Sequence, residues 1–151
     1  MGGLLVQDND DSEEKTENWI SVTNQKPSNQ MNLDLNFAWK ICKHVKSNAI
    51  VIAKDQKTIG IGAGQMNRVG AAKIALEASG SLCSEAVLAS DGFFPFADTV
   101  ELANEYGIKA IIQPGGSLRD QESIDMCNLK GISMVFTQKK ALFTLNYVDF
   151  G

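Results

Sequence analysis

Three loops of this 151-residue chain carry residue types that bind anionic or planar ligands. The first loop, Gly62–Arg68, is rich in glycine and ends in a cation, so its backbone N–H groups and Arg68 could hold an anion at the start of a helix. It lacks the closing glycine of a dinucleotide-binding fingerprint and the Gly-Lys-Ser/Thr of a P-loop. A tight strand-to-helix turn would use the same residues, and only Arg68 favours ligand binding over that simpler interpretation.

The second and third loops follow two later apolar stretches. The loop Asp91–Asp98 places three aromatic rings around one proline, which either pack among themselves or form a stacking surface for a planar ligand. Asp98 with Glu101 three residues later predicts a helix N-cap and its capping box. The loop Pro114–Ser117 has two glycines that could adopt positive φ and a serine that could cap the next helix. A ligand cradle and a plain turn would both use this loop, so both interpretations stay open.

The sequence shows no self-evident catalytic machinery. His44 is the only histidine and follows Lys43 on an expected helix, where a solvated or capping role is more common than catalysis. A single histidine leaves no His/Asp/Glu/Cys cluster and no Ser-His pair. The three cysteines lie far apart, which fits neither zinc-ligand spacing nor a disulfide framework. We therefore expect buried free thiols, no zinc and a reducing compartment, with the thiols at Cys42, Cys83 and Cys127.

The charge pattern argues against nucleic acid as a partner. The chain has 14 basic and 18 acidic residues, a net charge of −4, and the acidic excess falls within residues 1–31. The remaining residues have no basic surplus for binding a polyanion. No apolar stretch approaches the length of a membrane span, and the N-terminus lacks the features of a secretory signal. We expect no membrane association.

The elements that would position the three loops alternate between helix and strand. Apolar residues at every fourth position predict an amphipathic first helix, and a short apolar run before a turn at Asp55-Gln56 predicts a β-hairpin. The later alternation predicts right-handed crossovers and an α/β fold with a mainly parallel sheet, a leading hairpin and flanking helices. The loops would then meet at the carboxyl edge of the sheet, where such folds bind ligands. The expected helices are Leu33–Val45, Ala71–Ala78, Thr99–Tyr106 and Gln121–Leu129, and the expected strands are Ala49–Ala53, Thr58–Ile61, Ala86–Ala89, Ala110–Gln113 and Ser133–Phe136.

Several segments together match the pattern of one family. They are Phe37–Lys40, Lys43–Ile50, Gly60–Gln65, Leu88–Asp91, Phe93–Phe96 and Ile112–Ser117. They resemble the bifunctional purine biosynthesis proteins, which join aminoimidazole carboxamide ribonucleotide (AICAR) formyltransferase to IMP cyclohydrolase. The resemblance runs from Gly2 to about Thr137 and covers only the C-terminal part of the formyltransferase region.

The resemblance implies both a fold and an activity. The fold is a cytidine-deaminase-like three-layer domain without the deaminase zinc, here with an acidic arm or connection at 1–32, the formyltransferase subdomain at 33–137 and a tail at 138–151. The activity is formyl transfer from the cosubstrate 10-formyltetrahydrofolate to AICAR, in a cytoplasmic homodimer. The family's adjacent Lys-His catalytic pair belongs to an upstream half that this chain does not match, and Lys43-His44 lies in a different segment. We therefore expect no catalytic residue and no turnover by this chain alone, but association with itself or with the missing half.

The resemblance also implies roles for individual residues. The positions that match AICAR contacts are Asn48, Arg68, Phe93 and Lys140. The positions that match folate contacts are Val69, Asp98, Ser117 and Leu118. Asp91 matches a position near a structural potassium ion in some members of the family.

The C-terminal tail departs from the family pattern. Lys140 stands where the family has an arginine, and an ammonium group cannot reproduce the bidentate fork of a guanidinium. Thr144 stands in place of the family's terminal histidine. The altered tail keeps a second interpretation open, in which the chain is a non-catalytic nucleotide- or folate-binding or regulatory module derived from the enzyme.

Overall fold

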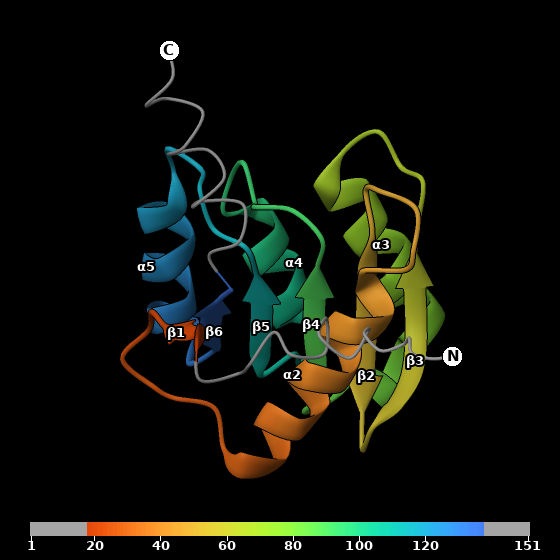
Figure 1. Cartoon of the computed structure of the whole chain (residues 1–151), viewed down its shortest axis with the longest axis horizontal. Coiled ribbons are helices and arrows are strands. Elements are labelled where there is room, and N and C mark those ends of the chain that lie inside the picture. Colours follow the sequence, from red (N-terminus) through yellow and green to blue (C-terminus); the bar gives the residue numbers. More distant parts are fainter. Residues whose placement is uncertain (1–17, 138–151) are drawn as a thin grey trace, which may run out of the picture.

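The computed structural model describes residues 18–137, which form a six-stranded sheet with helices on both faces (Figure 1). The strands are β1 (Ile20–Ser21), β2 (Ile50–Lys54), β3 (Lys57–Gly62), β4 (Val87–Ser90), β5 (Ala110–Gln113) and β6 (Ser133–Phe136). The helices are α2 (Asn29–Cys42), α3 (Arg68–Ser79), the 3₁₀-helix η2 (Gly80–Cys83), α4 (Asp98–Glu105) and α5 (Asp120–Lys130).

The strands lie in the order β1-β6-β5-β4-β2-β3. Strands β4, β5 and β6 pair in parallel, whereas β2 is antiparallel to both β3 and β4, and β1 is antiparallel to β6. Strands β3, β4, β5 and β6 therefore run in one direction. The loops that follow β3, β4 and β5 leave the sheet at the same edge, as the sequence predicted for a mainly parallel sheet with a leading hairpin.

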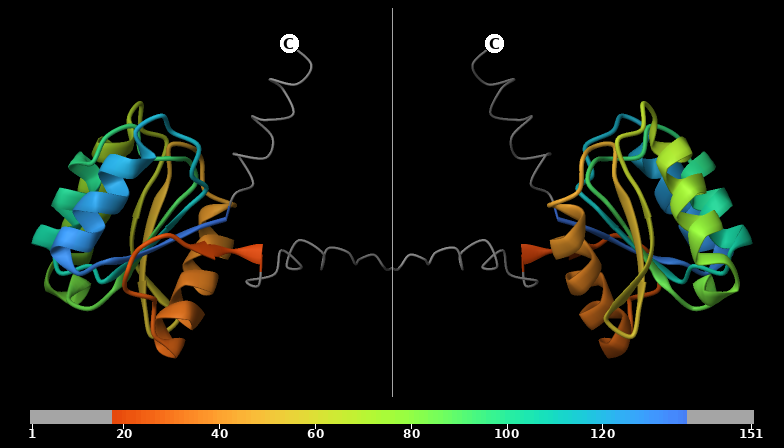
Figure 2. Two further views of the ribbon diagram at one scale, coloured as in Figure 1. Left: turned by 90° about the vertical axis from the view of Figure 1, so that its left-hand side faces the viewer. Right: turned by 90° about the vertical axis from the view of Figure 1, so that its right-hand side faces the viewer.

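Two apolar cores separate the layers, because successive side chains of a strand point to opposite faces. Ile50 and Ile52 of β2 belong to the core beneath α3, α4 and α5, whereas Val51 and Ala53 belong to the core beneath α2. The two side views in Figure 2 show α2 alone on one face and the other helices on the opposite face. The expected three-layer α/β arrangement is confirmed.

The β2–β3 hairpin turns at the two residues that the sequence indicated. Asp55 and Gln56 have φ of 53° and 56°, as a two-residue type I′ turn requires. The buried carboxylate of Asp34 in α2 accepts hydrogen bonds from both backbone N–H groups, at 3.1 and 2.8 Å. A side chain 21 residues away thus holds this turn in place.

Helix α3, which begins at Arg68, packs directly onto the backbone of β3. A Cβ at Gly62 would lie only 2.0 Å from the Ala71 carbonyl oxygen, and one at Gly60 would lie 2.2 Å from the Ala75 carbonyl oxygen. Glycine on the strand and alanine on the helix therefore allow an approach that larger residues would prevent.

Three local expectations differ from the structure. Helix α2 begins at Asn29 and ends at Cys42, and both ends lie earlier than predicted. It begins at Asn29 because the Ser28 hydroxyl caps it by accepting the Met31 N–H at 3.2 Å. Strand β1 was not expected; its two residues pair with β6 far along the chain. The predicted N-cap role of Asp98 is wrong: Asp98 is the first residue of α4, Ala97 precedes it, and no side chain caps the helix.

Candidate functional site

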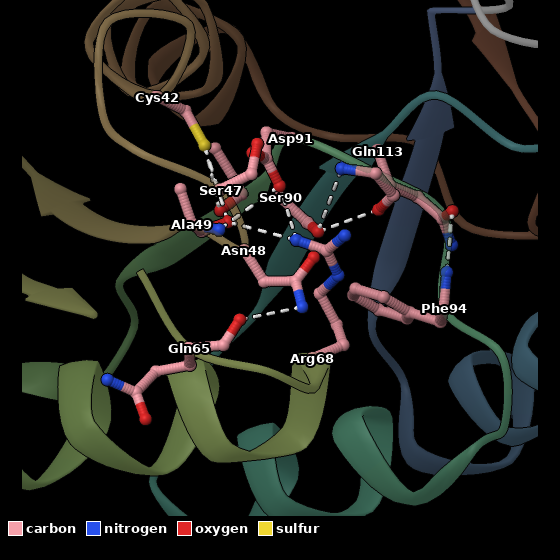
Figure 3. A network of polar contacts seen from close by, with 12 residues as sticks. Cys42, Ser47, Asn48, Ala49, Gln65, Arg68, Ser90, Asp91, Phe94 and Gln113 are labelled. Atoms are coloured by element: carbon pink, nitrogen blue, oxygen red, sulfur yellow. Dashed lines mark hydrogen bonds and ion pairs between the residues drawn. The ribbon is translucent and has the colours of Figure 1, made fainter. Parts of the chain in front are cut away.

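Three elements bring polar side chains together at the carboxyl edge of the sheet. Arg68 opens α3, Asp91 follows β4, and Ser47 and Asn48 precede β2. We call these four residues the arginine cluster (Figure 3). Helix α3 positions the arginine because its N-cap is fixed: the Asn67 side chain accepts the Gly70 N–H at 2.7 Å.

An ion pair forms the centre of the arginine cluster. The Nη1 of Arg68 contacts Oδ1 of Asp91, and the two side chains are only 10% and 14% exposed. Asp91 also accepts hydrogen bonds from the Ala49 N–H at 3.1 Å and from the Ser47 hydroxyl. The carboxylate is therefore surrounded by donors, which stabilise its charged form in a largely buried position.

The guanidinium of Arg68 has donors left over after this pairing. Its Nη1 also approaches the Ala49 carbonyl oxygen at 3.5 Å. Its Nε is buried and has no hydrogen-bond partner within residues 18–137. A buried N–H without a partner costs about 1–3 kcal/mol, so a small shift that let a ligand supply an acceptor would be favourable.

Asn48 is held in a fixed orientation beside the arginine. Its side-chain Nδ2 donates to the Gln65 carbonyl oxygen at 2.9 Å, and its backbone N–H donates to the same oxygen at 3.1 Å. The Ser47–Asn48 peptide bond is cis. Since the amide nitrogen is committed to Gln65, the amide oxygen is the end of Asn48 that remains to accept a hydrogen bond. The glycine-rich loop thus forms a strand-to-helix turn that also orients a polar side chain.

The potassium ion implied near Asp91 stays a prediction, and the Asp91 carboxylate already has other partners. Its Oδ1 accepts from Arg68 and Ala49, and its Oδ2 accepts from Ser47. A carboxylate that neutralises an adjacent guanidinium has little charge left for a cation. Within residues 18–137 no group of three or more His, Cys, Asp or Glu residues could hold a metal ion.

A second site lies on the two loops that follow β4 and β5. It is a cavity of about 270 Å³, which we call the aromatic cavity. Phe93 and Phe96 are 39% and 52% exposed, whereas Phe94 between them is fully buried in the core. The guanidinium carbon of Arg119 lies 5.3 Å from the centre of the Phe96 ring, which closes one rim. The lining residues are Phe93, Pro95, Phe96, Gly116, Ser117, Leu118 and Arg119.

The structure divides the residues implied by the resemblance between these two sites. Asn48, Arg68 and Asp91 lie in the arginine cluster, and Phe93, Ser117 and Leu118 line the aromatic cavity.

Three further implied residues lie elsewhere. Val69 follows Arg68 in α3 and is half-buried, whereas Asp98 is exposed at the start of α4 and is not among the cavity's lining residues. Lys140, like the rest of the expected tail at 138–151, lies outside the described residues.

The expected capping by Ser117 takes a different form. Its hydroxyl accepts the Arg119 N–H at 3.0 Å, in the turn before α5, and forms no cap of the helix itself. The carboxylate of Asp120 instead accepts the N–H groups of Gly116 and Ser117, at 2.8 and 3.1 Å. The third loop is therefore fixed by the first residue of the helix that follows it.

The cysteines and the histidine offer no nucleophile or base at these sites. All three cysteines are buried and free, as predicted. Cys42 lies beneath the arginine cluster, where burial, and secondarily the charge of Asp91, raises its pKa to about 12, although Arg68 opposes this shift. Its thiol therefore stays protonated at neutral pH. His44 is exposed in the turn after α2.

Sequence reasoning missed three residues that organise the site. Ser47, Gln65 and Gln113 were part of matched segments but had no assigned role. Their hydrogen bonds join elements that are distant in sequence, so no local pattern could have indicated them.

The fold is an α/β domain, and its two candidate sites lie at the carboxyl edge of the sheet. The family model of the AICARFT/IMPCHase bienzyme matches residues 1–78, and the chain belongs to this family. The resemblance noted in the sequence is therefore confirmed. In the described part of the chain, no helix is long and apolar enough to cross a lipid bilayer.

Curated relatives carry the same assignment. Over 140 residues the chain is 92% identical to the "Bifunctional purine biosynthesis protein PurH" of Prochlorococcus marinus strain AS9601, and 58% identical to that of strain NATL1A. Each match covers 93% of this chain and 27% of the relative. The chain thus spans about a quarter of the length of these proteins.

Solved structures of similar architecture include RibD of Acinetobacter baumannii (form 1). It has a TM-score of 0.47 and 20% sequence identity, over 70% of this chain and 33% of that one. A Thermotoga maritima diaminohydroxyphosphoribosylaminopyrimidine deaminase/5-amino-6-(5-phosphoribosylamino)uracil reductase has a TM-score of 0.45 and 20% identity, over 70% of this chain and 34% of that one.

Proposed function

We propose that this chain forms the substrate-binding C-terminal part of an AICAR formyltransferase. In that reaction the bond between the formyl carbon and N10 of 10-formyltetrahydrofolate breaks. A bond from the formyl carbon to the AICAR amine forms, the amine loses a proton, and N10 of the released tetrahydrofolate gains one. Membership in the bienzyme family supports the proposal, as does the PurH assignment of its relatives. The two sites lie on one continuous edge, because Asp91 and Phe93 belong to the same loop after β4.

The observation that carries the proposal is the buried, unpartnered Nε of Arg68. Asp91 holds one side of the guanidinium, so that Nε–H has a fixed direction. It would donate to an acceptor of the nucleotide once a local shift exposes it. The oriented amide oxygen of Asn48 would accept from an N–H of the same ligand, and AICAR carries both an amine and a carboxamide. Together the two side chains offer one donor and one acceptor to a planar heterocycle.

The aromatic cavity would receive the folate. Phe93 and Phe96 expose ring faces that can stack on the pterin or benzoyl group, and Arg119 at the rim can attract the glutamate carboxylates. Phe93 was implied to contact AICAR, yet it lines the cavity together with Ser117 and Leu118. A ring at the boundary of both sites fits a reaction in which the two substrates must touch.

We further propose that the chain binds substrates but does not turn over alone. The reaction needs a base for the amine and a donor for the developing oxyanion. The Lys-His pair that serves the family lies in the upstream half, and Cys42 stays protonated near neutral pH. Activity would need that upstream half or a second subunit, in the cytoplasm where purines are made.

Isothermal titration calorimetry with AICAR tests this proposal. We expect saturable binding that Arg68→Ala reduces at least tenfold. Lys73→Ala removes the same charge from an exposed position on the same helix and should leave the affinity within twofold. A failure to bind AICAR, or equal affinities for the wild type and Arg68→Ala, would contradict the proposal.

A formyl-transfer assay provides the second arm. The isolated chain should show no transfer from 10-formyltetrahydrofolate to AICAR, and turnover should appear when the upstream half of a PurH protein is added. Formyl transfer by the chain alone would contradict the proposal that catalysis needs the upstream half.

A further inference from the structure

Gln113 occupies a position between the two loops that form the aromatic cavity. It is the last residue of β5 and is fully buried, which is unusual for a side chain with both a donor and an acceptor. Neither its sequence context nor the family resemblance gave it a role. A buried amide must find partners, and the identity of those partners shows what it holds together.

The amide oxygen of Gln113 joins the two loops. Its Oε1 accepts the Phe94 N–H at 3.3 Å and the Gly115 N–H at 3.3 Å. Phe94 belongs to the loop after β4, and Gly115 belongs to the loop after β5. The amide nitrogen points elsewhere, toward the Met134 sulfur at 3.6 Å in β6.

Each loop is fixed to the core at the residue that Gln113 holds. The Phe94 side chain is fully buried, so its neighbour Phe93 is turned toward the cavity. Gly115 has φ of 79°, and a Cβ there would lie 2.5 Å from the Phe136 ring, so the backbone rests against that ring. The next two residues, Gly116 and Ser117, line the opposite side of the cavity. One oxygen atom thus accepts a hydrogen bond from each of the two loops that carry the walls.

We propose that Gln113 is a positioning residue that holds the two walls of the aromatic cavity at the separation required by a planar, folate-type ligand. This inference rests on the proposed function, because it assigns the folate to this cavity. Gln113 does not touch the ligand. It acts through the Phe94 and Gly115 backbones, and its acceptor oxygen is the group that matters.

Paired substitutions separate the two ends of the amide. Gln113→Leu removes the acceptor and leaves two buried N–H groups without a partner, so affinity for 5-formyltetrahydrofolate should fall by roughly tenfold or more. Met134→Leu removes only the contact of the amide nitrogen and conserves core volume, so the affinity should stay within about twofold. Affinity for AICAR should change by less than about threefold in both variants, because Arg68 and Asn48 lie on other elements.

A loss of AICAR affinity equal to the loss of folate affinity in Gln113→Leu would overturn the inference, since it would indicate general damage to the fold. Unchanged folate affinity in that variant would overturn it as well. If the wild-type chain binds AICAR but no 5-formyltetrahydrofolate, the proposed folate site is wrong, and the inference is wrong with it. If the wild-type chain binds 5-formyltetrahydrofolate but not AICAR, the proposed nucleotide site is wrong, and the folate affinities of the variants still test the role of Gln113.

Hydrogen exchange on the unmodified chain provides a test that does not depend on whether a variant folds. The Phe94 and Gly115 amides should exchange slowly, and their protection should increase together when 5-formyltetrahydrofolate binds. Fast exchange of either amide in the free chain, or a change confined to one of them on binding, would contradict the shared role of the Gln113 oxygen.

Discussion

The arginine cluster and the aromatic cavity lie on neighbouring loops but are built in opposite ways. In the cluster, Arg68 and Asp91 are nearly buried and are paired with each other and with backbone groups. In the cavity, Phe96 and Leu118 expose large apolar surfaces at 52% and 105%. The interactions of the cluster are therefore formed without a ligand, whereas the exposed apolar surface of the cavity would be stabilised mainly by a bound ligand.

This difference indicates where each site would obtain its binding free energy. The charges of the cluster are already desolvated and held by protein partners, so a ligand needs only the local shift that exposes the Arg68 Nε to gain a directed hydrogen bond. An exposed aromatic wall gains from apolar surface removed from water, at about 25 cal/mol per Å². Mutations in the cluster should thus affect stability and binding together, and mutations in the cavity should affect binding alone.

The largest effect is expected from breaking the buried ion pair. Arg68→Ala leaves the Asp91 carboxylate buried without its cation, which should lower the free energy of unfolding by about 3–5 kcal/mol. Urea denaturation at pH 7 measures this loss. Adding Asp91→Asn to Arg68→Ala should recover part of it, because the uncompensated charge is removed. A loss below about 1 kcal/mol in Arg68→Ala would mean that the cluster is not the preformed unit described above.

Alkaline pH should be the next strongest perturbation. Burial raises the pKa values of Cys42 and Cys127 from 9.0 to about 12. Because these folded-state values lie above the unfolded values, the stabilisation is complete below pH 9 and is lost as the pH rises toward 12. Each thiol should lower the free energy of unfolding by about 1.4 kcal/mol at pH 10, and the two together by about 3 kcal/mol.

Denaturation at pH 7 and pH 10 of the wild type and the double variant Cys42→Ala/Cys127→Ala measures this effect. Other groups that titrate in this range are common to both proteins, so the difference isolates the thiols. Equal losses between pH 7 and pH 10 in the two proteins would show that the thiols are accessible to water in the folded state.

Gly115, which precedes the lining residue Gly116 and packs against the core, should give an intermediate effect on stability when substituted. Gly115→Ala introduces a Cβ at positive φ and directs it into the Phe136 ring, which should cost about 2–3 kcal/mol. Gly64→Ala is the matched control, because Gly64 also has positive φ (65°) but only the end of the Lys46 side chain lies nearby, at 3.8 Å. It should cost only about 1 kcal/mol. Equal costs at the two positions would mean that the contact with Phe136 does not constrain the loop.

The smallest effect on stability is expected at the exposed rim. Phe96→Ala should change the free energy of unfolding by less than about 0.5 kcal/mol, since the ring is half exposed and its contact with Arg119 is at the surface. The same variant should weaken binding of 5-formyltetrahydrofolate several-fold, measured by fluorescence titration. A large loss of stability in Phe96→Ala without a loss of folate affinity would contradict the proposed difference between the aromatic cavity and the arginine cluster.

Much of the fold could be predicted from local patterns. The strands at Ala110–Gln113 and Ser133–Phe136 each contain a run of three apolar residues and lie where expected, and the turn at Asp55-Gln56 was correctly placed. Strand β1 could not be found, because two residues in a polar region become a strand only by pairing with β6. The Asp98–Glu101 pattern was misleading, since a capping motif predicts a helix start but does not fix its first residue.

Most members of the candidate sites could be singled out from the sequence, but their connections could not. Residue type drew attention to Arg68 and to the rings around Phe93, whereas Asp91 was singled out through the family resemblance. That Asp91 pairs with Arg68, 23 residues away, depends on how α3 lies against β3, and sequence spacing carries no such information. The role proposed for Gln113 was hidden for the same reason, because a glutamine at the end of a buried strand shows no partner until the loops are in place.

The most direct test of the preformed cluster is to observe the Arg68 side chain itself. A ¹⁵N-edited NMR titration with AICAR would follow the Nε–H resonance of Arg68, assigned by its loss in Arg68→Lys. We predict a distinct, dispersed signal in the free chain that shifts on addition of AICAR and saturates at the dissociation constant found by calorimetry. An Nε–H signal that stays unchanged while AICAR binds would show that the nucleotide is held elsewhere, and would contradict the proposed role of this cluster.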